Sequence, residues 1–590
     1  MALTAQQIEE QKKQAEELLF SEPHGIGFAQ GLFFGRFVAP LVFPYPQIDP
    51  SERETVNKAV VDVRRFAEEH IDATAIDRNA EIPQSVIDGL ADLGVLGMAV
   101  PKEHGGRGFS QLGYCKVMEV IGGHCAATAI FVNAHHSIGV RALVLFGTEE
   151  QKRRWLPPMA AGKALGAFAL TEPKAGSDAA NVQTQAIPSA DGRTYVLNGE
   201  KRYITNGAIA QVLTVMARTP VAGSKDTKVT AFLVTPDLPG FEVVEARMPK
   251  CGIRGTATAR LAFHDMPVPA ENVLGQVGKG LKVALTVLDF GRTTFGAACT
   301  GGAKTCMRAA IKHANERMQF QQTLSEFELV KKKIAFMAAN AFAMDAMTTQ
   351  CASFIDRGAE DYMLETAMLK LFTTEALWII VNDTLQIYGG QGYFTYEPYE
   401  RMMRDARINQ IGEGANDVLR AFIALVGMRA VGEGLKSIQD AAKHPVRERG
   451  TLWKFVRSQI GQRITSPEIP VRSPSLHEEA RRLSRRVRDF GLGVQRMLFR
   501  YREAILERQY VQERIADAAC DLYASSCTLA RLDHLLANGN HVPPEVNQDI
   551  VAGRYFMRLA DRRIKQHLRD LTDNDDEMTT LTANLWLGKR

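Results

Sequence analysis

The stretch of sequence that decides the fold is Ala167-Phe168-Ala169-Leu170-Thr171-Glu172-Pro173-Lys174-Ala175-Gly176-Ser177-Asp178. Its first four residues are apolar and predict a short buried strand. The Thr-Glu-Pro and Gly-Ser-Asp triplets predict a loop rich in hydroxyls and freed backbone N–H groups. Such a loop can approach a phosphate or the polar edge of a flat cofactor. Gly-Ser-Asp also occurs in ordinary turns, so the interpretation depends on the segments around it.

The composition is that of a large globular protein. A chain of 590 residues is too long for one core, and 45% hydrophobic with 23% charged residues is ordinary. A net charge of +4 gives no case for nucleic acid as the main partner. The eight cysteines form no C-x-x-C pair and no His-Cys cluster at zinc spacing, so we expect no metal site and a reducing compartment.

The N-terminal region carries no pattern of a membrane anchor. Residues 9–17 include four glutamates, unlike a signal or transit peptide. Residues 26–43 are rich in apolar side chains but contain Gln30, Arg36 and Pro40, so a spanning helix is rejected. We expect an irregular arm that packs on the body of the protein.

Helical periodicity and strand signals alternate along the chain. Ser51-Glu52-Arg53-Glu54 has capping-box spacing and predicts the start of a first helical region. From about Leu165 short β-rich runs follow, and Asn198-Gly199 predicts a hairpin with a type I′ turn. Helical patterns return from 279 to 429, interrupted at Gly389-Gly390-Gln391-Gly392, whose spacing is not that of a Rossmann fingerprint.

A linker and a further helical region follow. A Pro-, Ser- and Arg-rich segment runs from 441 to 475, and residues 483–505 then predict one long helix with a continuous apolar seam. Two more helical patterns, 511–532 and 546–568, predict a small terminal bundle.

These patterns predict a mainly α, multidomain α+β protein. The expected parts are an N-terminal arm (1–50), an N-terminal helical domain (51–164), a middle β-barrel or sandwich domain (165–275), a C-terminal four-helix domain (276–435), a basic amphipathic linker (436–475) and an additional C-terminal helical domain (476–590).

Collinear sequence blocks carry a family resemblance. They are Leu170-Thr171-Glu172-Pro173, Gly176-Ser177-Asp178, Gly252-Ile253-Arg254-Gly255-Thr256, Glu271-Asn272-Val273-Leu274-Gly275, Arg401-Met402-Met403-Arg404-Asp405 and Glu413-Gly414-Ala415-Asn416-Asp417. Over residues 42–427 this pattern resembles the acyl-CoA dehydrogenase family. The helical region that extends to Arg590, and Val42–Pro46, resemble its very-long-chain branch, whose members are dimers with an added C-terminal helical domain.

The resemblance implies FAD as the cofactor. Along the flavin, the matching residues are Phe168, Leu170, Thr171, Gly176 and Ser177, while the Tyr203 ring covers the flavin and the Thr205 hydroxyl lies near its N5 edge. Arg317, close to Phe320, contacts the FAD pyrophosphate across the dimer, and the adenosine half lies beside Gln386, Gly389 and Gly390. The last two matching positions, Ala415 and Asp417, follow the catalytic turn.

The resemblance also implies the substrate contacts and the base. Ser177 lies near the CoA arm, Asp289 and Arg292 lie beside the pantetheine, Gly412 and Gly414 flank the reacting carbons, and Glu413 is the catalytic base. Removing a weakly acidic α-proton needs a carboxylate in a dry pocket that raises its pKa. The family meets the developing charge on the thioester oxygen with the flavin ribityl chain and the N–H of the base.

Several residues depart from the family pattern. Gly412 stands where a Tyr or Phe is usual, which should widen the pocket or loosen the base. Ala415 replaces a Thr that contacts the flavin, Gln321 replaces a Gly, and Glu328 stands near a usual Gln. Asn133 lies in the segment expected to floor the acyl tunnel, and a core or surface role is expected for His135 and His136.

The expected function is α,β-dehydrogenation of a long-chain or bulky fatty acyl-CoA to trans-2-enoyl-CoA, with electrons passed to an electron-transferring flavoprotein. The alternatives are a non-catalytic, membrane-associated flavoprotein scaffold of the same fold, or an acyl-CoA oxidase. A homodimer is expected, and no nucleic-acid partner.

Residues 441–472 predict a membrane contact. They contain seven basic and two acidic residues, and Leu452, Phe455, Val456 and Ile460 fall on one helical face beside Trp453. A basic amphipathic helix suits an anionic membrane surface, although it can also pack on the terminal bundle. We expect a cytoplasmic protein with peripheral contact at the inner face of the membrane, or a mitochondrial-matrix protein if the source is eukaryotic.

Overall fold

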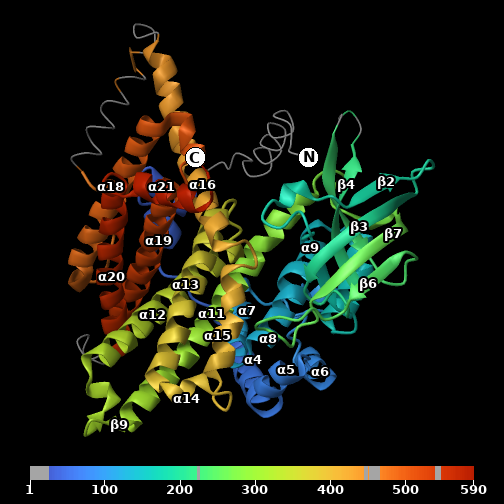
Figure 1. Ribbon diagram of the computed structural model, residues 1–590, viewed down its shortest axis with the longest axis horizontal. Coiled ribbons are helices and arrows are strands. Elements are labelled where there is room, and N and C mark those ends of the chain that lie inside the picture. Colours follow the sequence, from blue (N-terminus) through green and yellow to red (C-terminus); the bar gives the residue numbers. More distant parts are fainter. Residues whose placement is uncertain are drawn as a thin grey trace.

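The computed structural model places a β domain at one end of the molecule and helices over the rest (Figure 1). It describes residues 26–589 except 222, 224–225, 444–448, 451–452, 454–464 and 539–546. The C-terminal helices lie at the end opposite the sheet, and the helical domains lie between the two. The prediction of a mainly α protein with a middle β domain is therefore confirmed.

The N-terminal arm is packed in the core. It forms α2 (Phe28–Phe33) and α3 (Ala39–Val42). The Phe33 ring lies 5.1 Å from that of Phe490 in the C-terminal extension. The N–H of Ala29 donates to Glu365 Oε1 at 2.7 Å. The arm thus joins the additional C-terminal helices to the central helical domain.

The N-terminal helical domain begins with a different cap from the one predicted. Asp49, not Ser51, caps the first helix, and its carboxylate accepts from the N–H of Ser51 at 2.8 Å. The Glu52 carboxylate in the first turn of this helix accepts from the N–H of Ser110, the N-cap of α7, at 2.8 Å, so it joins the two helices. The elements are α4 (Pro50–His70), α5 (Ala73–Asn79), α6 (Gln84–Asp92), η1 (Lys102–His104), α7 (Gln111–His124), α8 (Ala126–Val132), the π-helical η2 (Asn133–Val140), α9 (Arg141–Phe146) and α10 (Glu149–Ala160).

Among the described residues, one helical stretch of this domain is long and apolar enough to cross a membrane, by length and composition alone. It covers Ala126–Phe146, and 72% of its most apolar window is buried inside the protein. His135 and His136, for which a core or surface role was expected, lie within this stretch and are fully buried.

The middle domain is one eight-stranded mixed sheet. Its order is β6-β7-β3-β2-β4-β5-β8, and β1 pairs in parallel with β4. The strands are β1 (Gly166–Ala169), β2 (Gln185–Pro188), β3 (Thr194–Ile204), β4 (Val212–Pro220), β5 (Thr227–Val234), β6 (Phe241–Glu245), β7 (Ala259–Pro269) and β8 (Val273–Leu274), with η3 (Ala179–Asn181) and η4 (Ala270–Asn272) between them. The buried strand predicted at the start of the 167–178 stretch is thus β1.

The predicted hairpin at Asn198-Gly199 is wrong. Both residues lie inside β3, where the register with β7 shifts between Leu197 and Gly199, so the pair forms a bulge rather than a turn. A Cβ on Gly199 would lie 2.5 Å from Thr184 Oγ1, so the glycine lets the next strand approach. Asn198 exchanges hydrogen bonds with Asp265 of β7. Tertiary pairing therefore overrides the local turn signal.

The C-terminal helical domain carries the long helices. The elements are α11 (Gly280–Glu316), β9 (Met318–Gln319), β10 (Gln322–Thr323), η5 (Leu324–Glu326), α12 (Glu328–Asp356), α13 (Met363–Tyr388), α14 (Gly390–Tyr393), α15 (Tyr399–Arg407), η6 (Ile408–Gln410) and α16 (Asn416–Ala442). Gly389, at φ 62°, turns the chain between α13 and α14, as the glycine cluster predicts.

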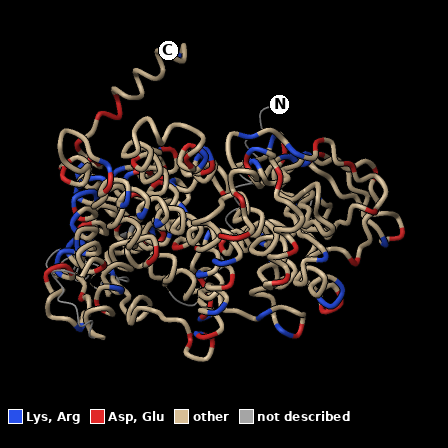
Figure 2. The backbone as a smooth tube through the Cα atoms, turned by 90° about the horizontal axis from the view of Figure 1, so that it is seen from below, with Lys and Arg blue, Asp and Glu red and all other residues tan. Residues whose placement is uncertain are grey.

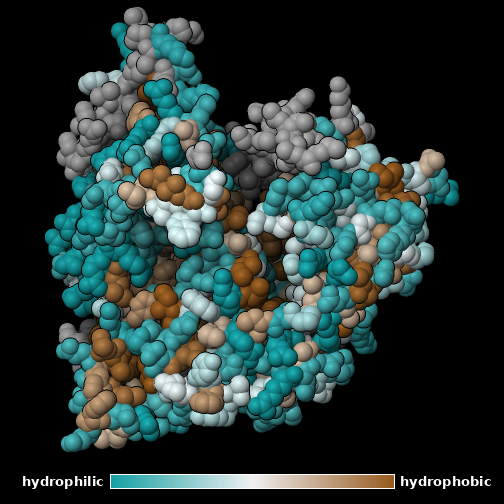
Figure 3. All heavy atoms as spheres, viewed as in Figure 1, coloured by the Kyte–Doolittle hydropathy of each residue, from teal (hydrophilic) through white to brown (hydrophobic). Residues whose placement is uncertain are grey.

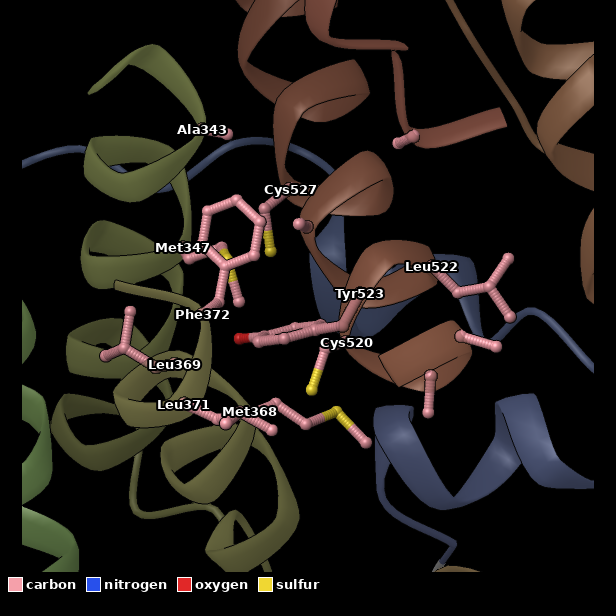
Figure 4. Close-up of a cluster of buried hydrophobic side chains, with 14 of the residues drawn as sticks. Ala343, Met347, Met368, Leu369, Leu371, Phe372, Cys520, Leu522, Tyr523 and Cys527 are labelled. Carbon is pink, nitrogen blue, oxygen red and sulfur yellow. The ribbon is translucent and has the colours of Figure 1, made fainter. Parts of the chain in front are cut away.

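The additional C-terminal helices share a core with this domain. They are η7 (Pro474–Leu476), α18 (His477–Tyr501), η8 (Arg502–Glu507), α19 (Gln509–Ala537), α20 (Gln548–Asp570) and α21 (Asp576–Trp586). Figure 4 shows Tyr523 of α19 between side chains of α12 and α13, and its hydroxyl lies 3.2 Å from Cys351 Sγ. The predicted long helix ends at Tyr501, so Ile505 lies in η8 instead.

The predicted amphipathic linker lies largely outside the described residues. The helix α16 continues to Ala442, past the expected boundary at 435, and Trp453 is 69% exposed.

At the other end of the C-terminal extension, α21 projects from the body of the protein (Figure 2). The same figure shows Lys, Arg, Asp and Glu intermixed over the surface. The domain boundaries remain a prediction.

Candidate active site

The turn between η6 and α16 carries Glu413 in a strained conformation. Glu413 has φ 58°, a value that non-glycine residues rarely adopt, and the following Gly414 has φ 94°. The turn brings the carboxylate against α11, where a Cβ on Gly291 would lie only 2.7 Å from Glu413 Oε2. The strain is thus tied to the placement of one carboxylate.

The two oxygens of Glu413 differ in their surroundings. Oε1 accepts a hydrogen bond from Asn133 Nδ2 at 3.1 Å. Oε2 is buried and has no hydrogen-bond partner. Burial raises the pKa of Glu413 to about 7, although the charges of Arg292 and Lys370 and the Asn133 hydrogen bond act to lower it. A carboxylate with one free oxygen and a pKa near neutrality can accept a proton.

Two buried cations frame this turn. Lys370 of α13 donates to Gly414 O at 2.7 Å and to Asn416 Oδ1 at 2.8 Å. Arg292 of α11 donates to Asp289 Oδ1 at 3.2 Å. Burial raises the pKa of Asp289 to about 6 against the opposing charge of Arg292. The two cations limit the rise in the pKa of the Glu413 carboxyl, and Asp289 forms an ion pair with Arg292.

Asp289 and Arg292 are both buried, and Arg292 lies against the catalytic turn, where a Cβ on Gly414 would be 3.7 Å from its guanidinium. Thr366 Oγ1 also donates to Asp289 Oδ1, at 2.8 Å. Gly412 lies next to the base, and a Cβ there would meet only Ile408 O, at 3.6 Å. A Cβ at this position would therefore displace no neighbour.

The loop after β1 is held by a buried ion pair. Glu172 Oε1 lies 2.6 Å from Lys201 Nζ, and its carboxylate also accepts from the N–H groups of Gln183 and Thr184. Burial raises the pKa of Glu172, but the Lys201 charge and these hydrogen bonds outweigh it, so the pKa lies below its ordinary value. The glutamate of the Thr-Glu-Pro triplet is a structural anchor.

This loop and the end of β3 form one edge of the site. The N–H of Arg202 donates to Thr171 O at 2.9 Å, and Lys201 Nζ donates to Leu170 O at 3.1 Å, so the loop after β1 lies against the end of β3. Phe168 lies in β1 just before this loop, Tyr203 lies near the end of β3, and Thr205 directly follows β3. Tyr203 is 57% exposed, and its backbone has φ 62°. Gly176 and Ser177 are also exposed, in the loop after β1. An outward-facing ring beside an open backbone loop fits a flat, polar-edged group such as a flavin.

The remaining predicted cofactor residues lie elsewhere. Arg317 and Phe320 follow α11, next to β9, and the Phe320 ring is 88% exposed. Gln386, Gly389 and Gly390 lie at the end of α13, and the His313 and Tyr388 rings stack 4.0 Å apart, so the two helix ends are neighbours. Figure 1 shows β9 and α14 far from the sheet. One chain therefore carries two separate groups of predicted FAD contacts.

Two predicted residues of the catalytic turn lead into α16. Ala415 caps the helix without a side-chain hydrogen bond, and Asp417 in the first turn is fully exposed, 3.8 Å from Arg420.

In the part of the chain that the structure describes, no group of three or more His, Cys, Asp or Glu side chains is arranged to hold a metal ion.

Sequence reasoning missed the roles of three residues of the site. Asn133 was expected in the tunnel floor, but its hydrogen bond to Glu413 was not. Lys370 had one signal, a lysine inside the apolar run Met368–Phe372. Gly291 had none, because its role depends on how closely α11 approaches the turn.

Comparison with known families decides the identity. The acyl-CoA dehydrogenase N-terminal domain matches residues 53–163, the middle domain 167–266 and the C-terminal domain 278–428. The ACAD9/ACADV C-terminal domain matches residues 474–584. The chain belongs to the acyl-CoA dehydrogenase family. It is an enzyme, an FAD-dependent acyl-CoA dehydrogenase with the C-terminal helical extension of the very-long-chain branch.

Individual relatives agree with this assignment. The mitochondrial very long-chain specific acyl-CoA dehydrogenase of Homo sapiens is 37% identical over 546 residues, which cover 91% of this chain and 83% of the relative. Probable acyl-CoA dehydrogenase FadE10 of Mycobacterium tuberculosis is 34% identical over 606 residues, which cover 99% of this chain and 92% of the relative.

Solved structures agree as well. An acyl-CoA dehydrogenase from Bacillus anthracis, complexed with FAD, matches with a TM-score of 0.79 and 27% identity over 94% of both chains. Butyryl-CoA dehydrogenase from Megasphaera elsdenii matches with a TM-score of 0.61 and 33% identity, over 64% of this chain and 98% of its own. The shorter enzyme lacks a counterpart to more than a third of this chain.

Proposed function

We propose that this acyl-CoA dehydrogenase converts long-chain or bulky fatty acyl-CoA to trans-2-enoyl-CoA, with Glu413 as the base. The observation that carries the proposal is the buried, unpaired Oε2 of Glu413, on a carboxyl whose pKa is raised to about 7. A structural carboxylate would have both oxygens paired, because an unpaired buried acceptor costs about 1–3 kcal/mol.

In this proposal Glu413 Oε2 takes the α-proton of the acyl thioester while the β-carbon loses a hydride, and the Cα–Cβ bond becomes a double bond. FAD, when bound, supplies the acceptor for that hydride. Arg292 and Lys370 stabilise the carboxylate before proton transfer. The backbone N–H of Glu413 is proposed to meet the charge on the thioester oxygen, and Ser177 with Gly414 to contact the substrate.

The proposed preference for long or wide acyl chains rests on two observations. The very-long-chain specific dehydrogenases are among the relatives that cover most of this chain. At Gly412 no side chain fills the space beside the base. Together they favour a substrate whose chain is longer or broader near the thioester than butyryl.

A homodimer would unite the two groups of FAD contacts. One group, Arg317, Phe320 and Gln386–Gly390, lies near β9 and α14 in the C-terminal helical domain. The other group, Phe168–Ser177 with Tyr203 and Thr205, lies at the sheet, far from the first (Figure 1). Apolar residues gather on the surface around β9 in Figure 3, where Met318 and Phe320 are exposed. We therefore propose that each FAD binds residues of two subunits.

The homodimer proposal is tested with Arg317→Glu and a matched control, Arg308→Glu, at an exposed position of α11, the helix that Arg317 follows. Loss of FAD and of the dimer mass in the first variant only is expected. FAD retention by a monomeric protein would contradict the proposal.

Membrane contact through 441–472 and a cytoplasmic or matrix location also remain proposals. The exposed Trp453 is the described residue that supports membrane contact. Co-sedimentation with anionic liposomes should be lost in the Trp453→Glu, Phe455→Glu double variant, and equal binding by both proteins would contradict it.

The proposed function is tested by anaerobic titration of the FAD-loaded enzyme with a panel of acyl-CoAs. Flavin absorbance should be bleached by long or branched chains and less by butyryl-CoA. Absence of bleaching by every acyl-CoA would contradict it. Reoxidation by an electron-transferring flavoprotein, rather than by oxygen, is the expected result of a second mixing step and excludes an oxidase.

A further inference from the structure

Only one oxygen of the Glu413 carboxylate, Oε1, is hydrogen-bonded, so the group that donates to Oε1 also determines where Oε2 points. The only hydrogen bond that the described residues give its carboxylate is the one from Asn133 Nδ2 to Oε1. On the other side Gly291 approaches Oε2 so closely that a Cβ would clash with it. Asn133 and α11 therefore confine the carboxylate from two directions.

The orientation of the Asn133 amide is determined by its neighbours. An ionised carboxylate oxygen can only accept, so the nitrogen of Asn133 must face Glu413. Asn133 Oδ1 then faces Thr294 of α11, and the Thr294 hydroxyl donates to it. The Asn133 side chain is thus hydrogen-bonded at both ends.

A buried chain of hydroxyls continues behind Thr294. Thr294 Oγ1 lies 2.9 Å from Ser137 Oγ, which lies 3.4 Å from the hydroxyl of Tyr114. All of these side chains, and Asn133 itself, are buried. Buried polar side chains that are connected in this way are rigid, because each would lose a partner by rotating.

The backbone under this network is also unusual. Asn133–Val140 is π-helical, and both Asn133 and Ser137 lie within it. A π-helical turn inside an α-helix is rare and occurs frequently at functional sites. Here it presents both polar side chains to Thr294 on α11.

We propose that Asn133 is a positioning residue for the reaction, which holds Oε1 of Glu413 so that Oε2 meets the α-carbon, and that Thr294 fixes the Asn133 amide for this task. The proposal rests on the proposed function, in which Glu413 is the base. It adds a donor that acts on the base and not on the substrate.

The inference predicts a change in the pH dependence of turnover that packing alone does not. A hydrogen bond to the ionised carboxylate favours that form, so its loss should raise the pKa of Glu413. The other charged groups that face Glu413, Arg292 of α11 and Lys370 of α13, remain in place. A side chain that only fills space would affect stability and leave the pH dependence of turnover unchanged.

The test compares three variants of the FAD-loaded enzyme. Asn133→Leu keeps the size of the side chain and removes the donor. Thr294→Val keeps its shape and removes the hydroxyl that orients the amide. Thr300→Val is the matched control, because Thr300 is a buried threonine of the same helix whose hydroxyl bonds to Gly296 O at 2.8 Å.

Turnover and melting temperature are measured against pH, together with the rate at which a 3-thia acyl-CoA exchanges its α-hydrogens with D₂O. That exchange follows proton transfer without net oxidation. Asn133→Leu should slow turnover and exchange by about 10- to 100-fold and move the acidic limb upward by about one pH unit. Thr294→Val should slow turnover and exchange by about 3- to 10-fold and move the acidic limb upward by less than Asn133→Leu does. Thr300→Val should match the unmodified enzyme.

The two proposals can fail separately. If Glu413→Gln keeps normal exchange, the proposed base is wrong. If Glu413→Gln is inactive but Asn133→Leu keeps the rate and the pH limb of the unmodified enzyme, the positioning role is overturned. If Asn133→Leu does not fold, Thr294→Val decides, and an unchanged pH limb in that variant overturns the inference.

Discussion

Two glutamates in two loops of this enzyme differ in how many of their carboxylate oxygens are paired, and their pKa values shift in opposite directions. Glu172, in the loop after β1, has a lysine 2.6 Å away and two backbone donors, and its pKa lies below the ordinary value. Glu413, in the turn before α16, has one donor and a free buried oxygen, and its pKa is raised to about 7. Full pairing makes a carboxylate an anchor, whereas incomplete pairing leaves it able to accept a proton.

The largest expected effect separates these two roles by activity. Glu413→Gln should lower turnover at least ~10³-fold with FAD still bound, because the α-proton then has no acceptor. Steady-state assays and flavin absorbance measure both quantities. A variant with near-normal turnover would show that Glu413 is not the base.

The same substitution should not harm stability. Since the pKa of Glu413 is raised in the folded protein, its ionisation opposes folding as the pH rises above the unfolded value and through about 7. The glutamine has no such cost, so at pH 8 the variant should melt at or above the temperature of the unmodified enzyme.

The second effect is the reverse pattern at Glu172. Glu172→Gln leaves Lys201, which is fully buried, without its counter-charge, and should lower the free energy of unfolding by about 3 kcal/mol. Turnover per bound FAD should stay within about tenfold of normal. Denaturant unfolding and flavin-normalised assays test this. A stable but inactive variant would remove the distinction between the two glutamates.

The smallest effect concerns the open space beside the base. Gly412→Tyr adds a ring where a Cβ meets only Ile408 O, and should shift preference toward unbranched chains by about 1–3 kcal/mol in relative kcat/KM. Competition between straight and branched acyl-CoAs measures the shift. An unchanged substrate profile would show that Gly412 does not set the width of the pocket.

The sequence predicted the fold where signals were local or repeated. The β1 strand, the helical periodicity of α11–α16 and the glycine turn at 389 are such cases. The Asn198-Gly199 hairpin was wrong because pairing with β7 decides the conformation there, and the cap at Ser51 was wrong because a better acceptor, Asp49, precedes it.

The candidate site divides in the same way. The family resemblance predicted Glu413, Arg292 and Tyr203 as site residues, but a resemblance cannot show which glutamate is paired. Lys370, Asn133 and Gly291 are far from the turn in the sequence, and Asn133 is 280 positions from Glu413. They reach the turn only because η2, α11 and α13 pack against it. The linker around Trp453 remains a prediction, since most of it lies outside the described residues.

The most direct test of the central claim is the anaerobic rate of flavin bleaching by a long-chain acyl-CoA across pH, with α-hydrogen and α-deuterium substrates. Because the base works only when ionised, the rate should rise about tenfold per pH unit and level off near pH 7, with a primary isotope effect on the acidic limb. A rate that is flat from pH 5.5 to 8.5, or a Glu413→Gln variant with the same limb, would contradict the account.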